Sequence, residues 1–292
     1  MLRIAKKQQD GTLVGERVAI RRLLRNRQLV VGGVLVLALI LLGLLAPWIT
    51  PYPYGEPHCE HAWERSSRKF LFGTDALGRD LLSRVVYGTR VSLTVAFGST
   101  AIVLFLGTFV GAVSGYFGGR VDFALMRFVD IMLAFPSLLF IILLSVVLGS
   151  GVGSMILAIG LTRWARLTRV VRGEFLRIRN MDFVLAAHAL GASPMRIIIR
   201  HILPNSVAPI IVFITFAIPF AIVAEAGLGF IGLGVNPPLP SWGVLLNGGF
   251  RSFRPFPNLV LWPSLMLALT MFGFVLFGDG LREGSDPTLG SQ

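Results

Sequence analysis

Residues 29–49 read LVVGGVLVLALILLGLLAPWI, a run of 21 residues without a charged side chain. A helix rises about 1.5 Å per residue, so about 20 apolar residues cross the hydrocarbon core of a bilayer. A helix also satisfies its own backbone hydrogen bonds, which lipid cannot do. Because the run is of full spanning length and starts far from Met1, we expect a first transmembrane helix rather than a cleavable signal.

The composition of the whole chain agrees with a membrane protein. Of 292 residues, 54% are hydrophobic and 14% are charged, whereas about a quarter of the residues in a soluble domain carry charge. The excess of 27 Lys and Arg over 15 Asp and Glu lies beside the apolar runs. This placement indicates contact with headgroups, not with nucleic acid. The single cysteine, Cys59, excludes a disulfide framework within the chain.

Five further apolar runs follow, at residues 91–113, 125–148, 151–167, 207–230 and 259–277. We therefore predict an all-α polytopic membrane protein with about six transmembrane helices, or five if the third and fourth runs form a re-entrant pair. The predicted parts are a tail (1–28), the first helix (29–49), an external loop (50–90), a five-helix domain (91–279) and a second tail (280–292). The fourth run ends in Arg163, Arg166 and Arg169, which we expect to reach toward the water interface.

The basic residues also predict an orientation. If the N-terminus is cytoplasmic, 19 of the 27 Lys and Arg fall on the inner side and eight on the outer side. Cytoplasmic loops carry the basic excess in membrane proteins. We therefore expect both tails in the cytoplasm, and residues 50–90 with Cys59 outside.

An interrupted helical segment, within a predicted cytoplasmic loop at about 172–205, separates two of the runs. Asp182 is a suitable N-cap for a short helix over 183–190, and Gly191 falls where a left-handed C-cap is needed. Ser193 and Pro194 then start a second helix, which Pro204 is expected to end.

This segment is more apolar than a free loop. Its apolar side chains are Met195, Ile197, Ile198, Ile199 and Ile202. Exposed apolar clusters indicate a binding surface. The alternatives are a docking element for a cytoplasmic subunit and an amphipathic helix that rests on lipid.

The same segment resembles a known signature. "AAHALG" at 186–191 is followed nine residues later by "HILP" at 201–204, which is similar to the cytoplasmic motif of ABC importer membrane subunits. The matching residues are Ala186, Ala187, Gly191, Leu203 and Pro204. Leu185 stands where the family usually has glutamate, and His201 where it often has isoleucine.

Four longer blocks extend the resemblance, at residues 72–93, 115–138, 227–246 and 278–287. They are similar to the second permease of dipeptide and oligopeptide importers. The resemblance implies the type I ABC importer permease fold in a prokaryotic cell membrane. It also implies a homologous second permease, two cytoplasmic ATPases that bind ATP and Mg, and an extracytoplasmic substrate-binding protein. The helical pair would sit in a cleft on the ATPase and transmit its closure.

The cargo implied by the resemblance is a di- or oligopeptide. The alternatives with the same architecture import nickel, glutathione, an opine or an oligosaccharide, and a remote alternative is an autonomous channel or secondary carrier. No cofactor is expected in this chain. A phosphate-binding loop needs a lysine after glycine, and none of Lys6, Lys7 and Lys69 follows one.

Two enzyme or metal interpretations are weaker. Glycine-flanked serines such as Ser114 occur in the spans, but a serine nucleophile needs a base within hydrogen-bond reach, and no histidine lies at membrane depth. "HCEH" at 58–61 resembles a metal-ligand cluster, yet adjacent residues do not easily face one ion. We expect a solvated loop there.

Three further sets of charged residues stand out. Glu225 lies near the outer end of the fifth run, and is either a gate or pathway residue or a headgroup-level partner of an arginine from the external loop. Asp130 is expected to pair with Arg127, one turn away. An external segment with Arg79, Asp80, Ser83 and Arg84 is expected to form a short amphipathic helix that contacts a partner protein.

Overall fold

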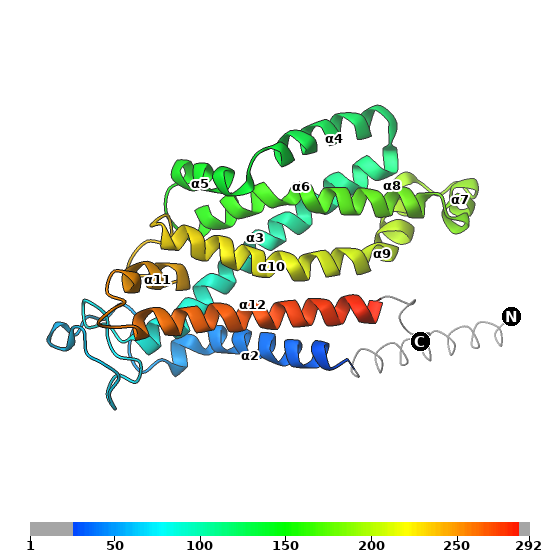
Figure 1. The fold of residues 1–292 in the computed structure, drawn as a ribbon. Helices are drawn as coiled ribbons and strands as arrows, with labels where there is room; N and C mark the ends of the chain where they lie inside the picture. Colours follow the sequence, from blue (N-terminus) through cyan, green and yellow to red (C-terminus); the bar gives the residue numbers. More distant parts are fainter. Residues whose placement is uncertain (1–25, 286–292) are drawn as a thin grey trace.

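A computed structural model describes residues 26–285, which form helices joined by turns and loops (Figure 1). The long helices are α2 (Arg27–Ile49), α3 (Leu81–Phe117), α4 (Gly119–Ala134), α5 (Ser137–Leu148), α6 (Val152–Arg179), α10 (Val207–Phe230) and α12 (Asn258–Ser285). The short ones are η1 (Cys59–His61), α7 (Asp182–Ala189), α8 (Pro194–Ile197), the π-helical η2 (Ile198–Ile202), α9 (Leu203–Asn205) and α11 (Trp242–Phe250).

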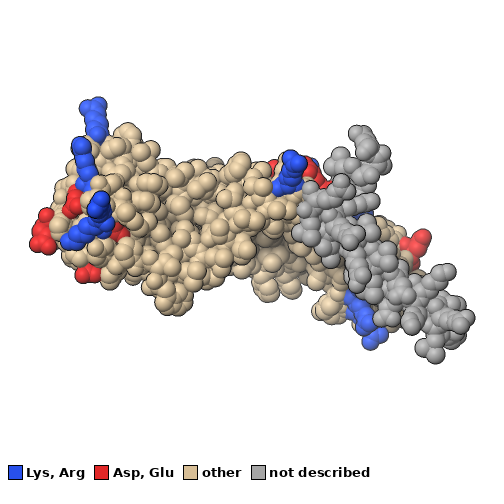
Figure 2. Space-filling model, turned by 90° about the horizontal axis from the view of Figure 1, so that it is seen from below, with Lys and Arg blue, Asp and Glu red and all other residues tan. Residues whose placement is uncertain are grey.

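The long helices run roughly side by side, so the molecule has two ends (Figure 1). We call one the α7 end, where α7, α8 and α9 lie. The other is the α11 end, where α11 and residues 50–80 lie. Side chains with charge gather toward both ends, and a broad uncharged band separates them on the face shown in Figure 2. This distribution matches a protein that spans a bilayer.

The all-α polytopic fold is confirmed, but the spans differ in detail from the prediction. Four helices of the described part are long and apolar enough to cross a membrane, namely α2, α3, α10 and α12. A fifth span is obtained only if α4 and α5, bent by 88°, count together. The sequence predicted about six, and the difference lies in residues 125–167.

The predicted third run, 125–148, is broken at Phe135 and Pro136. Phe135 adopts extended backbone angles (φ −77°, ψ 135°), because the ring of a following proline disfavours the helical conformation. The predicted fourth run is the first part of α6, which continues to Arg179. α6 is long enough to span, but its arginines keep it outside the group of apolar helices.

α3 begins at Leu81, ten residues before its predicted start. Asp80 is the N-cap, and its Oδ2 accepts hydrogen bonds from the Ser83 backbone N–H (2.7 Å) and hydroxyl (2.6 Å). The expected short amphipathic helix is therefore the first turn of a 37-residue helix. The external segment at 50–90 stays a prediction, and its last ten residues are helical.

Glycines allow α3 and α6 to pack closely. A Cβ on Gly111 would lie 2.7 Å from the Val171 Cβ and 2.8 Å from the Thr168 carbonyl oxygen. Gly107 and Gly115 approach α6 in the same way, one turn before and after Gly111. Small residues at such spacing let helix backbones approach in a membrane, where lipid supplies no hydrophobic force between helices.

Two salt bridges connect α4 to α6. Arg172 of α6 donates to both carboxylate oxygens of Asp122 (2.5 and 2.6 Å), which also accepts from Ser114. Arg169 pairs with Asp130 at 2.7 Å. The expected pair of Asp130 with Arg127 was therefore wrong, because the Arg127 guanidinium lies over the Phe123 ring instead.

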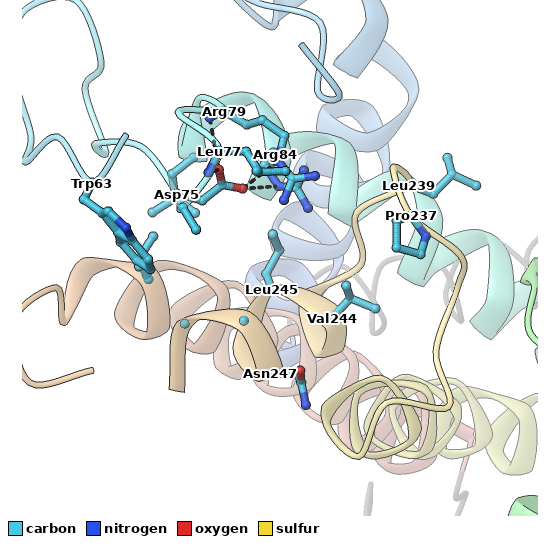
Figure 3. Close-up of a pocket in the computed structure, with 15 residues that line it drawn as sticks. Trp63, Asp75, Leu77, Arg79, Arg84, Pro237, Leu239, Val244, Leu245 and Asn247 are labelled. Carbon is cyan, nitrogen blue, oxygen red and sulfur yellow. Dashed lines mark hydrogen bonds and ion pairs between the residues drawn. The ribbon is translucent and has the colours of Figure 1, made fainter. Parts of the chain in front are cut away.

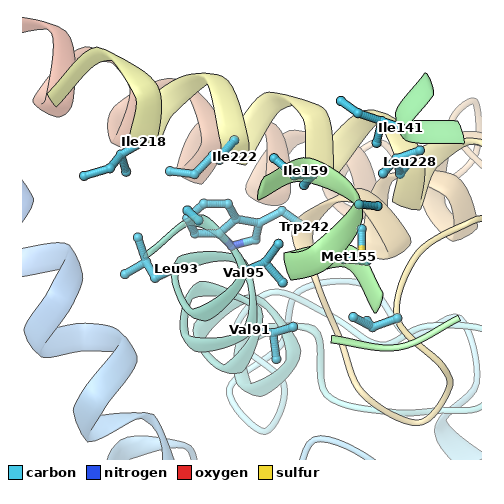
Figure 4. Packing of buried hydrophobic residues seen from close by; sticks show 14 of the residues in the cluster. Val91, Leu93, Val95, Ile141, Met155, Ile159, Ile218, Ile222, Leu228 and Trp242 are labelled. Atoms are coloured by element: carbon cyan, nitrogen blue, oxygen red, sulfur yellow. The ribbon is translucent and has the colours of Figure 1, made fainter. Parts of the chain in front are cut away.

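Trp242 is the centre of the largest apolar cluster (Figure 4). Its side chain is fully buried among residues of α3, α6 and α10, and its indole N–H donates to the Val85 carbonyl (3.2 Å). Nothing in the hydropathy pattern predicted α11, which is too short to span. Trp242 anchors it to the bundle.

The glycine contact between α3 and α6 yields a first prediction. Gly111→Leu should prevent correct assembly or lower the melting temperature, because overpacking a tight contact costs about 1–3 kcal/mol or more. Gly173→Leu on α6 is the matched control, since a Cβ there meets nothing within 4 Å. Fluorescence-detected size exclusion of the two variants after heating measures the difference. Equal stability of both would contradict the packing argument.

Candidate functional site

The helical pair at the α7 end is anchored by a few side chains. Val184 of α7, Ile197 of α8 and Ile202 of η2 are buried in an apolar cluster with the C-terminal half of α6. Of the apolar residues that the sequence analysis named in this segment, Ile197 and Ile202 are thus buried against other parts of the same chain. Met195 and Ile199 remain exposed.

Gly191 ends α7 as the sequence predicted. Its φ is +79°, a conformation that costs a residue with a Cβ about 1–2 kcal/mol. The Gly191 N–H donates to the His188 carbonyl (3.0 Å) and the Ala192 N–H to the Ala187 carbonyl (3.1 Å). This pair of bonds is the Schellman motif, and it fixes the angle between the two helices.

The starts of the two helices also follow the sequence closely. Met181 is the N-cap of α7 and Asp182 its first residue, so the helix starts one position earlier than predicted. An acidic side chain in the first turn still stabilises the helix through its dipole. Ser193 is the N-cap of α8 and Pro194 its first residue, as expected.

Pro204 does not end the second helix, so that prediction was wrong. The chain passes from α8 through the π-helical turn η2 into α9, which contains Pro204. Proline lacks an N–H and clashes with the carbonyl four residues earlier. The wider π turn accommodates this, because the Leu203 N–H donates five residues back to the Ile198 carbonyl.

The outer side of the helical pair is exposed and apolar. Leu190 is 88% exposed and Leu185 55% exposed, while Ala186 is exposed and Ala187 half-buried. Leu203 is half-buried and Pro204 exposed. The signature residues belong to α7, the turn after it and α9, all at the α7 end, where α7 projects past the long helices (Figure 1).

Glu225 lies at the opposite end, inside the protein. Its side chain is fully buried in α10, and its Oε2 accepts a hydrogen bond from the Ser92 hydroxyl of α3 (2.7 Å). Ser92 in turn accepts from the Trp242 backbone N–H at the start of α11 (3.5 Å). Among residues 26–285, no basic nitrogen lies within 4 Å of the carboxylate. The alternative that paired Glu225 with a loop arginine was therefore wrong.

Glu225 thus connects three helices where α11 covers the bundle. Ser241, the N-cap of α11, precedes Trp242, and its hydroxyl accepts from the Val244 backbone N–H. Sequence reasoning missed Ser92 and Trp242 as neighbours of Glu225, because they come from segments 133 and 17 residues away. The only local signal was Ser241 as an N-cap before apolar residues.

A pocket at the α11 end lies between residues 63–84 and α11 (Figure 3). Asp75 Oδ2 pairs with the Nε atoms of Arg79 (2.7 Å) and Arg84 (3.6 Å). Asp80, Ser83 and Arg84 are buried within the chain. Of the four residues expected to contact a partner, only Arg79 therefore reaches the surface.

The side chains of residues 58–61 turn to different neighbours. His61 Nδ1 lies 2.8 Å from Glu64 Oε2, and Cys59 is free and exposed. Hydrogen bonding from Ser67, together with the neighbouring His61, holds the pKa of Glu64 below its ordinary value. Within the described part of the chain, no three His, Cys, Asp or Glu side chains are arranged to hold a metal ion.

Comparison with known protein families identifies the family of this chain. A family described as "Binding-protein-dependent transport system inner membrane component" matches residues 104–291. The chain belongs to this family. Residues 17–65 match a second family, the N-terminal TM domain of oligopeptide transport permease C. The permease is accordingly a multi-pass inner membrane protein and not an enzyme, and the ATPase of the transport system is a separate subunit.

Individual relatives cover nearly the whole permease. It is 39% identical to the "Oligopeptide transport system permease protein OppC" of Bacillus subtilis (strain 168), over 93% of this chain and 89% of that protein. It is 37% identical to the "Glutathione transport system permease protein GsiD" of Pectobacterium atrosepticum, over 93% and 90% of the two chains.

A solved structure supports the fold. A chain of the MetNI methionine ABC transporter in an inward facing conformation superposes with a TM-score of 0.59 at 17% identity, over 70% of this chain and 98% of that chain. The permease therefore has the fold of an ABC importer permease.

The position of Glu225 yields a second prediction. Glu225→Gln keeps an oxygen that accepts from the Ser92 hydroxyl but removes the ionisable carboxyl beside α11. Transport by the purified importer in vesicles should fall several-fold, while co-purification of its subunits stays normal. Glu56→Gln, at an exposed carboxylate of the same end, should change neither. Transport at the wild-type rate by the Glu225→Gln importer would contradict a role of Glu225 in the gate or the pathway.

Proposed function

We propose that this permease forms half of the translocation pathway of an ATP-driven importer for di- or oligopeptides, and that its helical pair at the α7 end couples the pathway to the ATPases. The partners would be a homologous second permease, two ATPases that bind ATP and Mg, and an extracytoplasmic binding protein. The peptide cargo is supported by the OppC and DppC relatives.

The exposed apolar surface of α7 carries this proposal. Among residues 26–285, Leu190 is almost uncovered and Leu185 is more than half exposed at the α7 end. Ala186 and Ala187 are small, so the backbone of α7 can sit close inside a cleft. The Schellman turn at Gly191 holds α7 and α8 at a defined angle, which a lever that transmits motion requires.

The composition of α7 weighs against a lipid surface as the partner of this helix, whereas the basic residues Arg196 and Arg200 lie in α8 and η2. Helices that rest on a bilayer carry Lys and Arg on the polar face. α7 reads DFVLAAHA and contains neither, whereas Asp182 adds a negative charge. A protein cleft therefore fits α7 better than anionic headgroups do. Leu185, in place of the family's usual glutamate, makes this contact more apolar.

The proposed cycle follows from these parts. ATP binding closes the two ATPases, whose clefts carry the helical pairs inward, and the permeases change from inward-open to outward-open. Hydrolysis resets them. A ligand shifts such an equilibrium only by its differential affinity for the two states. The work therefore comes from ATP and from the loaded binding protein.

A second cargo is favoured by one relative. The similarity to the glutathione permease GsiD is nearly as high as that to OppC, and glutathione is itself a small peptide. Nickel, an opine or an oligosaccharide remain alternatives with the same architecture. An autonomous channel is disfavoured, because it would have no use for the exposed helical pair.

Gly191 tests the coupling role. Gly191→Val forces a β-branched residue into a left-handed conformation, so the helical pair should lose its angle. We expect at least about tenfold loss of ATP hydrolysis stimulated by loaded binding protein, which corresponds to about 1.4 kcal/mol. Gly191→Asn is the matched control, since asparagine tolerates this conformation, and it should keep most of the stimulation. Normal stimulated hydrolysis and full ATPase content in Gly191→Val would rule out the coupling role.

Cys59 tests the proposed orientation, in which the α11 end faces outward and both termini lie in the cytoplasm. A membrane-impermeant maleimide should label Cys59 in intact spheroplasts, because this thiol is exposed. The converse control is Leu190→Cys in a Cys59→Ser background, which should be labelled only after permeabilisation. The opposite pattern would reverse the topology and remove the docking argument.

A further inference from the structure

A groove with three arginines lies between α6, α10 and α12, with a volume of about 360 Å³. Arg163 and Arg166 come from α6 and Arg282 from α12. The opposite wall is apolar and includes Phe213, Phe216 and other residues of α10. This site is separate from the helical pair and from Glu225.

The groove runs along the helices, with Arg163 half-buried and Arg166 and Arg282 exposed. Arg163 precedes the last residue of α6 by 16 positions, so it lies about 24 Å along the helix from the α7 end. Arg166 is nearly one turn closer to that end, and Arg282 is near the last turn of α12. The three charges therefore form a path from the α7 end toward the middle of the bundle.

These arginines lack the acidic partners that their neighbours have. Arg169 and Arg172 of the same helix are paired with Asp130 and Asp122. Within residues 26–285, by contrast, Arg163, Arg166 and Arg282 form no ion pair with Asp or Glu and no side-chain hydrogen bond.

An aromatic ring orients Arg163. Its guanidinium lies 3.3 Å from the centre of the Phe220 ring. Such stacking stabilises the cation through its flat face. It leaves the N–H groups at the edge of the guanidinium free to bind an anion. The aromatic contact is therefore compatible with a ligand, whereas an acidic partner would occupy the same donors.

A charged side chain within a transmembrane bundle almost always faces the bundle interior or a water-filled cavity rather than lipid. Arginine presents a planar set of donors that matches a carboxylate with two parallel hydrogen bonds. We infer that this groove binds the carboxylate of the cargo as it passes toward the α7 end. The inference rests on the proposed peptide cargo, because an unmodified peptide carries a C-terminal carboxylate.

Thiol labelling tests the groove in the assembled importer. Ala217 lines the groove, so Ala217→Cys in a Cys59→Ser background places one thiol there. The vesicles carry the α7 end outside. The rate at which an anionic (sulfonate) methanethiosulfonate reagent labels the thiol is compared with the rate for a cationic (trimethylammonium) one. The ratio of rates is normalised to that of Leu190→Cys, at a side chain 88% exposed at the same end.

We expect the normalised ratio to favour the anionic reagent by about tenfold, as in a cleft lined by one sign of charge. Arg163→Gln with Arg166→Gln should remove this preference, and Arg254→Gln, an exposed arginine of the α11 end, should not. A dipeptide with a free C-terminus, added at the α7 end, should slow labelling, and its C-terminal amide should not.

Several results would overturn the inference. They are a thiol that neither reagent reaches, an unchanged ratio in the double variant, and equal protection by the amide. Protection by an anionic lipid alone would assign the arginines to a headgroup. These outcomes do not depend on the binding protein or on ATP. Absence of peptide uptake by the wild-type importer would instead contradict the proposed function.

Discussion

The close packing of α3 against α6 is the contact on which the rest of the structure depends. Three glycines spaced by four residues let the two backbones approach, and a Cβ at Gly111 would overlap α6. At one end of this pair, α6 supports α7 and α8 through Phe175 and Ile178. At the other, α3 supplies Ser92 to the Glu225 and Trp242 contact. A displacement of α6 along α3 would therefore alter both ends.

α10 gives the same two ends a second connection. It follows η2 and α9 directly at the α7 end, and it carries Glu225 near the α11 end. Its charge-free surface suits lipid or an apolar partner, whereas the wall it shares with α6 and α12 faces three arginines. A movement of the helical pair would therefore displace α10, and with it α11, which packs against α10 at the other end.

The sequence predicted those features that local physical chemistry determines. The runs at 29–49 and 207–230, the left-handed Gly191 and the start of α8 at Pro194 all follow from composition or backbone preference. The features it did not predict depend on distant contacts. Asp130 pairs with Arg169, 39 residues away. α11 is held by Trp242 in a cluster to which six other helices contribute. The break before Pro136 had a local signal, the proline itself, but the continuous apolar run around it was interpreted as one span.

Accumulation of a labelled dipeptide in liposomes tests the account most directly. The permease is reconstituted with its homologous partner and the ATPases, with ATP on the side of the α7 end and loaded binding protein on the side of the α11 end. The account predicts accumulation above the external concentration only when ATP, both permeases and the binding protein are all present. Dipeptide flux through this chain alone, or accumulation without ATP, would contradict it.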